Sequence, residues 1–454
     1  MLNELIGKIS DFVWGPPMLV LLVGTGVFLS FRLKFLQFSQ LPYALKLAFS
    51  KNQDHSSEGD VSHFAALMTA LAATIGTGNI AGVATAVIFG GPGAVFWMWM
   101  TALFGMATKY SEAILAVKFR TVDARGEMAG GPMYYIEKGL GWKWLGILFA
   151  IFASIAAFGI GNMVQSNSVA YAVKESMGVT PWITGLILAL FTGFVLLGGI
   201  QSIGKVSSFL VPVMALFYVA GGIIIILMNL DKVPEALILI FSNAFSGKAA
   251  AGGALGTVIR YGVARGVFSN EAGLGSAPIA AAAAKTDMPG RQALVSMTGT
   301  FLDTIVVASI TGLVLVMSGL YSGVDLKNPQ AAEITVRAFE MFLPHIGQWI
   351  VSIGIILFAY STIIGWAYYG EKSFEYLFGT KSIFFYRLVF TIAVFVGTTV
   401  ELKTVWNIAD VMNGMMAIPN LIGLIGLNGV IVAETKRFQE QRRIEKQKLN
   451  SILG

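Results

Sequence analysis

The stretch Thr-Ile-Gly-Thr-Gly-Asn-Ile-Ala-Gly at residues 74–82 interrupts one long apolar run, and Arg-Gly-Val-Phe-Ser-Asn-Glu-Ala-Gly-Leu-Gly-Ser-Ala-Pro at residues 265–278 interrupts another. Both stretches place glycines beside polar groups, among them Asn79, Asn270 and Glu271. In hydrocarbon, backbone that leaves the helix is tolerated only where it is buried in protein or lines a cavity. Close helix packing explains many small residues in membrane proteins, but not asparagine and glutamate at mid-depth. The two stretches therefore predict broken helices around a functional site.

The composition indicates a membrane protein. Of 454 residues, 56% are hydrophobic and 12% are charged, and the mean hydropathy is +0.73. Soluble domains carry about a quarter charged residues, so the charge is too sparse to cover a water-exposed surface. The net charge of +6 does not indicate nucleic acid, because Lys and Arg gather in short loops and in a terminal tail. Cysteine is absent, which excludes a disulfide framework and a cysteine nucleophile.

Eleven apolar runs are long enough to cross a bilayer, which takes about 20 helical residues. Their expected limits are 12–31, 64–89, 93–118, 144–173, 180–199, 206–229, 254–284, 292–319, 345–370, 383–399 and 404–432. The broken runs are the second and the seventh, so they cross in opposite directions and each opens a block of five helices. Broken helices at matching positions of two inverted blocks point to the binding site of a transporter.

The predicted fold is therefore an all-α polytopic membrane protein made of two inverted five-helix repeats behind one extra helix. The expected divisions are 1–61 for the extra helix and its linker, 62–230 and 231–432 for the repeats, and 433–454 for a charged tail. Lys and Arg favour one side of the membrane by roughly three to one. This bias predicts a plasma-membrane protein with its N-terminus outside and its C-terminus in the cytoplasm.

Each helix break has a defined chemistry. The half-helix after a break presents free N–H groups with partial positive charge, which suit a carboxylate. The half-helix before it ends in free carbonyls, which suit an ammonium group or a sodium ion. We expect the amides of Gly78 and Asn79 to bind a substrate carboxylate and the carbonyls near Phe268 and Ser269 to bind its amine. Further substrate contacts predicted from the same stretches are Thr77, Asn270 and Gly273.

The chain resembles the alanine/glycine:cation symporter family. The motifs that carry the resemblance are TIGTGNIAG at 74–82, GGPGAVFWMW at 90–99, AGGPMYYIEKGLG at 129–141 and SNEAGLGSAPIAAAA at 269–283. The likeness covers about residues 62–429. It implies a leucine-transporter-like fold and uptake of alanine or glycine with Na⁺, the co-transported ion, or in some members with H⁺. We further expect alternating access as the mechanism, the lipid bilayer as surroundings and a monomer as the working unit.

The resemblance also implies a sodium site and two further pocket residues. In this fold, carbonyls of the first core helix meet a Ser/Thr pair on the eighth, which here gives Ala72, Ile75, Phe358, Ser361 and Thr362. Serine and threonine in membrane helices also bond back to their own helix carbonyls. The helix that lines the substrate site contributes Gln165, with interhelical hydrogen bonding as its other interpretation, and Trp366 is expected to bound the side-chain pocket.

Proton coupling, a channel and an enzyme are the alternatives to sodium symport. Proton coupling needs a titrating carboxylate within the membrane, and Glu271, Asp303 and Asp410 are candidates. We expect Arg260 and Arg265 to neutralise Glu271 as an ion pair. A channel is disfavoured because channels use rings of like filters. An enzyme is disfavoured because the sequence holds no HExxH, GxSxG or phosphate-binding motif.

Overall fold

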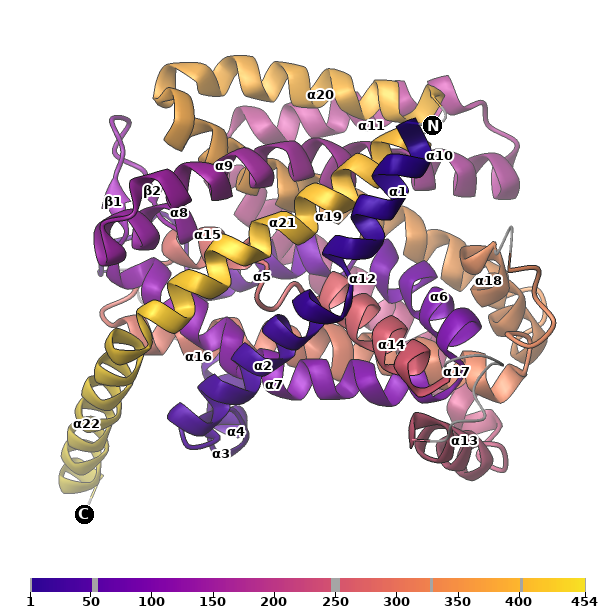
Figure 1. Ribbon diagram of the computed structural model, residues 1–454, viewed down its shortest axis with the longest axis horizontal. Coiled ribbons are helices and arrows are strands. Elements are labelled where there is room, and N and C mark those ends of the chain that lie inside the picture. The colour runs from indigo at the N-terminus through magenta and orange to yellow at the C-terminus, as the bar shows by residue number, and fades with distance from the viewer. Residues whose placement is uncertain (1, 51–55, 246–253, 327–329, 401–402, 454) are drawn as a thin grey trace.

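The computed structural model describes residues 2–50, 56–245, 254–326, 330–400 and 403–453. Over these ranges the protein is almost entirely helical, with one small hairpin of β1 (Thr121–Val122) and β2 (Met128–Ala129) (Figure 1). The helices of the first half are α1 (Leu2–Val13), α2 (Pro16–Arg32), α3 (Leu36–Ser39), α4 (Leu41–Ala48), α5 (His63–Thr74), the 3₁₀ turn η1 (Thr77–Asn79), α6 (Ala81–Gly90), α7 (Gly93–Lys118), α8 (Pro132–Tyr135), the π-helical turns η2 (Ile136–Leu140) and η3 (Gly159–Met163), α9 (Lys143–Phe158), α10 (Val164–Met177), α11 (Pro181–Leu197) and α12 (Gly199–Met228).

The second half follows the same pattern of long helices joined by short turns. Its elements are α13 (Val233–Phe245), α14 (Ala254–Asn270), α15 (Ala277–Ala282), α16 (Pro289–Thr300), the π-helical turn η4 (Phe301–Ala308), α17 (Ser309–Ser318), α18 (Ala331–Phe342), α19 (Gly347–Phe378), the 3₁₀ turn η5 (Thr380–Ser382), α20 (Ile383–Thr399), α21 (Lys403–Gly426) and α22 (Asn428–Leu453). Helices α7 and α20 have the limits predicted from the sequence.

The predicted first helix, 12–31, differs in the structure. Helix α1 ends at Val13, and α2 begins at Pro16, so the run is two helices. Proline is favoured at the first position of a helix because it has no N–H to leave unpaired. The paired prolines at 16 and 17 therefore start a new helix where the hydropathy alone predicts one continuous helix.

Both predicted breaks are present. In the first, α5 and α6 are bent by 59° across the segment that holds η1. The side chain of Asn79 stabilises this break, because its Oδ1 accepts the Gly76 N–H at 3.0 Å. A Cβ at Gly76 would lie 2.5 Å from the Thr362 hydroxyl, so only glycine lets the broken segment approach α19 this closely.

In the second break, α14 ends at Asn270 and α15 begins at Ala277. The backbone between them turns left-handed at Glu271, Gly273 and Gly275, with φ of +55°, +90° and +84°. Side chains disfavour this region, and glycine adopts it without cost. The glutamate at φ +55° is the exception, which marks a position held by its surroundings.

Six described helices are long and apolar enough to cross a bilayer, or seven if the bent pair His63–Thr74 and Thr77–Gly90 is one span. The six run over Lys143–Met177, Gly199–Met228, Pro289–Ser318, Gly347–Phe378, Thr380–Thr399 and Asn407–Gly426, and shorter apolar helices cover Pro16–Arg32, Pro181–Leu197 and Val233–Phe245. Large apolar side chains on the outside of the bundle, such as Phe194, Phe209 and Phe384, are more than 70% exposed. Such a surface suits hydrocarbon and not water.

The two ends of the bundle differ. The β1–β2 hairpin and α22 lie at one end, which we call the hairpin end, and α13 and α18 lie at the other (Figure 1). Of the tail predicted at 433–454, the described residues, 433–453, belong to the long helix α22, which contacts the rest of the chain. Its Phe438 packs on Gly290 at the start of α16, and Arg442 lies 3.5 Å from the centre of the Tyr43 ring.

Candidate functional site

A small cavity lies where the two broken helices cross. Its volume is about 20 Å³, and a single water needs roughly 10–15 Å³, so the pocket is nearly closed in this structure. Its walls come from both breaks and from α19, η3, α10 and α21: Ala73, Thr74, Gly76, Thr77, Gly78, Ile160, Gln165, Phe268, Glu271, Thr362, Trp366 and Asn413. Five of the predicted substrate contacts, Thr77, Gly78, Gln165, Phe268 and Trp366, line this cavity.

The polar wall of the cavity is partly ordered by internal hydrogen bonds. The Thr77 hydroxyl donates to Gln165 Oε1 at 3.2 Å, and Gln165 Nε2 donates to the Ile160 carbonyl at 3.0 Å. Buried Asn413 Oδ1 has no hydrogen-bond partner among the described residues. A buried acceptor without a donor is costly, so this oxygen offers a place for a donor such as an ammonium group.

The cavity wall also fixes its size. Trp366 is 2% exposed, and its Cβ sits directly against the position that a Cβ on Gly161 would take. The residue at 161 therefore has to be glycine for the indole to fit beside η3. The carboxylate of Glu271 lies at the same cavity and accepts the Ser276 hydroxyl at 2.6 Å.

Four predicted substrate contacts lie behind the cavity instead of on its wall. Asn79 Nδ2 donates to Asp303 Oδ1 at 2.8 Å, and the Ser269 hydroxyl donates to Asp303 Oδ2 at 2.9 Å. The Asn79 N–H, which we assigned to the substrate carboxylate, donates to the Gly76 carbonyl at 3.1 Å inside the turn. In this structure Asp303 thus joins both breaks to η4.

The other two belong to the second break itself. Asn270 Oδ1 accepts the Ala272 N–H at 3.0 Å, and the Gly273 N–H donates to Glu112 at 3.1 Å. These contacts shape the left-handed segment that places Glu271 at the cavity. In this structure both residues therefore stabilise the non-helical backbone between α14 and α15.

Two helices outside the breaks supply the groups that hold this segment. Glu112 Oε1, on α7, accepts the N–H groups of Gly273 and Gly275 at 3.1 and 3.2 Å. Asn420, on α21, donates to the same Oε1 at 2.6 Å and to the Gly273 carbonyl at 2.9 Å. The Tyr135 hydroxyl donates to Asn420 Oδ1. All three of these bonds to Glu112 go to Oε1, and its buried Oε2 has no hydrogen-bond partner among the described residues. The bonds to Oε1 hold the irregular backbone in one arrangement.

One ionisable group near the breaks has no hydrogen-bonded partner. Lys109 is 4% exposed, and its ammonium makes no hydrogen bond within the described ranges. The charges that act on it are the carboxylates of Glu112, Glu271 and Asp303. The predicted ion pair of Arg265 with Glu271 is not formed, since the Arg265 guanidinium lies over the Phe268 ring at 5.7 Å. Lys109 and Glu112 are separated by three positions inside an apolar helix, and this sequence signal could have identified them.

The predicted sodium ligands are brought together. Ser361 Oγ lies 3.2 Å from the Ala72 carbonyl oxygen and 3.4 Å from that of Ile75, and Thr362 Oγ1 lies beside Gly76. Both hydroxyls also donate to the Phe358 carbonyl, at 2.8 and 2.9 Å. These groups are carbonyl and hydroxyl oxygens, which fit a hard cation, and rotation of the two hydroxyls would free their lone pairs for it.

A wide vestibule opens beside the cavity. It measures about 410 Å³, and Thr77 lines both spaces. Polar side chains along the vestibule include Tyr171, Glu175 and Glu333. Its walls come from α10, α18 and α19, so it faces the end of the bundle opposite the hairpin (Figure 1).

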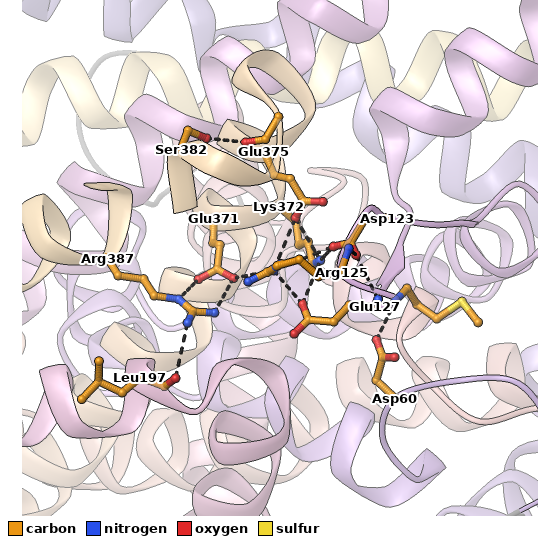
Figure 2. A network of polar contacts seen from close by, with 12 residues as sticks. Asp60, Asp123, Arg125, Glu127, Leu197, Glu371, Lys372, Glu375, Ser382 and Arg387 are labelled. Carbon is orange, nitrogen blue, oxygen red and sulfur yellow. Dashed lines mark hydrogen bonds and ion pairs between the residues drawn. The ribbon is translucent and has the colours of Figure 1, made fainter. Parts of the chain in front are cut away.

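At the hairpin end a network of ion pairs closes the bundle (Figure 2). Buried Lys372, on α19, lies 3.1 Å from Asp123, 3.3 Å from Glu127 and 2.9 Å from Glu375. Burial alone would raise the pKa of Asp123, but hydrogen bonds from the Glu127 N–H and from the Glu375 side chain, together with the charge of Lys372, lower it to about 2. These ion pairs hold the hairpin to α19.

The hairpin is also tied to the broken helices. Asp60, just before α5, accepts the Met128 N–H at 2.8 Å. Arg120 donates to the carbonyls of Ala282 and Ala284, which follow the second break, at 3.1 and 2.7 Å. The hairpin therefore connects both broken helices to α19.

Crossed broken helices around a closed cavity, with a vestibule on one side and an ion-pair network on the other, define a membrane transporter of the leucine-transporter-like fold. The crystal structure of MhsT in complex with L-phenylalanine has this fold, with a TM-score of 0.59 at 14% identity over 83% of this chain and 99% of that one. The chain belongs to the sodium:alanine symporter family, which it matches over residues 1–451. The members of this family are transporters and not enzymes.

Two relatives are similar along nearly their whole length. The sodium/alanine symporter AgcS of Methanococcus maripaludis is 63% identical over 97% of this chain and 98% of its own. The probable sodium/glutamine symporter GlnT of Bacillus subtilis is 36% identical over 98% of this chain and 92% of its own.

Proposed function

We propose that this protein imports alanine, and the smaller glycine, by symport with sodium. The observation that carries the proposal is the meeting of Ser361 with the Ala72 and Ile75 carbonyls beside the substrate cavity. A cation held there lies directly behind Gly76 and stabilises the break that forms the cavity. Binding of cation and substrate would thus favour the same conformation, which is the physical basis of coupling.

We assign the substrate to the small cavity. Its carboxylate would lie at the Gly78 amide and the Gln165 side chain, since the Asn79 amide is engaged within the turn. Its ammonium would lie among the Phe268 carbonyl, Glu271 and the unpartnered Asn413 oxygen. The cavity of about 20 Å³ would have to widen to admit an amino acid, and Trp366 would then leave room for a methyl group and not for a long side chain. Such exclusion is steric, because one methylene changes binding by only about 1–3 kcal/mol.

We further propose that transport follows alternating access in a fold of eleven membrane helices and two inverted repeats, residues 62–230 and 231–432. The unit of α5–α7 and α14–α17 would rock against the unit of α9–α11, α19 and α20. The vestibule would face the outside and the hairpin end the cytoplasm, as the distribution of Lys and Arg predicts. The monomer contains the whole cavity and would be the working unit.

The decisive experiment is uptake of labelled alanine into proteoliposomes under an inward Na⁺ gradient, with the same K⁺ gradient as control. Concentrative uptake with Na⁺ alone supports the proposal. The alternative is proton coupling, which Glu271 and Asp303 favour as buried carboxylates beside the breaks. Uptake that is driven by an acid-outside pH gradient without Na⁺, and that is lost in Asp303→Asn, would show that the coupling ion is the proton and not sodium.

A further inference from the structure

A groove separate from the substrate cavity lies at the hairpin end, between α11 and α20. Its volume is about 420 Å³. Its lining divides into two kinds of residue. Apolar side chains, including Leu197, Phe384 and Leu388, form its walls, and three cations, Arg125, Lys381 and Arg387, lie at its head.

The apolar walls face outward from the bundle. Leu197, Phe384 and Leu388 are 69%, 73% and 49% exposed. Helices α11 and α20 lie side by side along one face of the molecule (Figure 1). In a membrane-spanning chain this face meets lipid, so hydrocarbon chains have direct access to the groove.

The cations at the head have no acid among the groove's lining residues. The nearby carboxylate of Glu371 is 1% exposed and lies behind Arg387, which binds it through Nε and Nη2 at 2.7 and 2.8 Å (Figure 2). Arg125 is 31% exposed and lies 2.7 Å from Glu127, with the carboxylates of Asp123, Glu371 and Glu375 farther off at 3.8–4.0 Å. Lys381 is exposed, and its ammonium makes no ion pair with any residue that the structure describes. The groove itself is therefore lined by cations, of which the two arginines share the carboxylates behind them and Lys381 has no ion pair within the described ranges.

We propose that this groove binds an anionic phospholipid of the leaflet at the hairpin end. The phosphate would lie between Lys381, Arg125 and Arg387, and an acyl chain would lie along Leu197, Phe384 and Leu388. Basic pockets between membrane helices recognise anionic headgroups in this way. A soluble anion would use the cations but not the apolar walls, and a neutral lipid would use the walls but not the cations.

The lipid groove is connected to the hairpin and α19, which would separate during the proposed transport cycle. Arg125 and Arg387 belong to the network that joins the hairpin to α19. A bound phosphate would add an anion at the edge of this network and shift the energy needed to separate the hairpin from α19. We therefore expect the lipid to change the rate of uptake as well as to bind, and this second effect rests on the proposed function.

Binding is tested on the purified full-length protein by native mass spectrometry with added phosphatidylglycerol or phosphatidylcholine. The test variant is Arg125→Gln/Lys381→Gln, and the matched control is Lys436→Gln/Arg443→Gln, which removes two exposed cations from α22. One cation near a lipid surface is worth about a fivefold change in affinity, so the test variant should bind phosphatidylglycerol roughly 25-fold more weakly than wild type. The control should bind it as wild type does.

A second variant separates the walls from the charges. Leu388→Trp fills the groove at an exposed position and keeps all three cations, and it should also lose phosphatidylglycerol. Equal binding of the neutral and anionic lipids by wild type would overturn the proposal, as would equal losses in the test and control double variants. Alanine uptake in phosphatidylcholine liposomes, with and without phosphatidylglycerol, gives the functional readout. Absence of uptake in every lipid would reject the proposed function and leave the binding result standing.

Discussion

Ser361 Oγ lies 3.2 Å from the Ala72 carbonyl oxygen, although 289 positions separate the two residues in the chain. The contact joins an unbroken helix, α19, to the end of the first half of a broken one, α5. Its carbonyl belongs to the last turn of α5, where carbonyls lose their helical partners. A hydroxyl and a free carbonyl at this distance offer two oxygens to one small cation.

We expect Ser361→Ala and Thr362→Val each to raise the Na⁺ concentration for half-maximal uptake by roughly tenfold, or about 1.4 kcal/mol. The reason is the loss of one oxygen ligand with the packing nearly unchanged. Ser373→Ala is the matched control, because Ser373 lies on the same helix and donates only to the Tyr369 carbonyl at 2.8 Å. Uptake measured against Na⁺ concentration checks this, and equal Na⁺ dependence in all three variants would place the cation elsewhere.

Substitutions at Gly161 and Trp366, which set the size of the cavity, should change the range of substrates. Gly161→Ala places a methyl group against the Trp366 Cβ and pushes the indole toward the cavity. We expect alanine uptake to fall by at least about tenfold, since overpacking costs roughly 1–3 kcal/mol, and glycine uptake to fall less. Competition of labelled alanine by unlabelled glycine measures the shift.

Gly24→Ala is the control for that variant, because a Cβ there meets nothing within 4 Å. Trp366→Ala should act in the opposite direction and admit a longer side chain such as that of glutamine. If neither change alters the order of substrates, the small cavity is not the site that selects them.

Substitution of Asn420, which does not line the cavity, should lower the free energy of unfolding. Asn420→Leu removes three hydrogen bonds, those to Glu112 and to the Gly273 carbonyl and the one from the Tyr135 hydroxyl, and leaves all three partners buried. We expect a loss of about 2–4 kcal/mol, because buried polar groups left unpaired carry their full desolvation cost. Thermal unfolding in detergent measures it. The control is Asn428→Ala, because half-buried Asn428 donates to the Ile425 carbonyl, three positions before it, and not to either break. An unchanged unfolding temperature would mean that the second break does not depend on this contact.

The ion pairs of the hairpin should make the stability of the fold depend on pH in the acid range. The pKa of Asp123 is lowered to about 2 in the folded protein, whereas an unperturbed aspartate has a pKa near 3.9. Its contribution to stability is therefore present above about pH 4 and lost as the pH falls toward 2. Asp123→Asn should lower stability at pH 7 and flatten the loss between pH 4 and 2.

Tryptophan fluorescence against pH follows this transition. Asp287→Asn is the control, since Asp287 is 42% exposed in its pair with Arg291 at 2.8 Å. A surface pair of this kind contributes little. Identical acid profiles for the two variants would show that the hairpin ion pairs do not hold the bundle closed.

The sequence alone located both helix breaks, because glycines and polar side chains in mid-membrane have no other stable arrangement. It also gave the limits of helices such as α7 and α20, since the length of an apolar run is set by the bilayer. The resemblance then identified the family, and it brought Ser361, Thr362, Ala72 and Ile75 to one expected site, which the structure gathers.

Only the tertiary structure decided which polar residues face the cavity and which hold it in shape. Asn79, Ser269, Asn270 and Gly273 are in the right stretches, but their hydrogen bonds to Asp303, Thr304, Glu112 and the local backbone turn them away from the cavity wall. Asn413 and Asn420 come from α21, a helix whose sequence gives no sign of contact with either break. Helix periodicity fixes a residue's position around its own axis, but the direction of its side chain is decided by the neighbouring helices, and these come from distant parts of the chain.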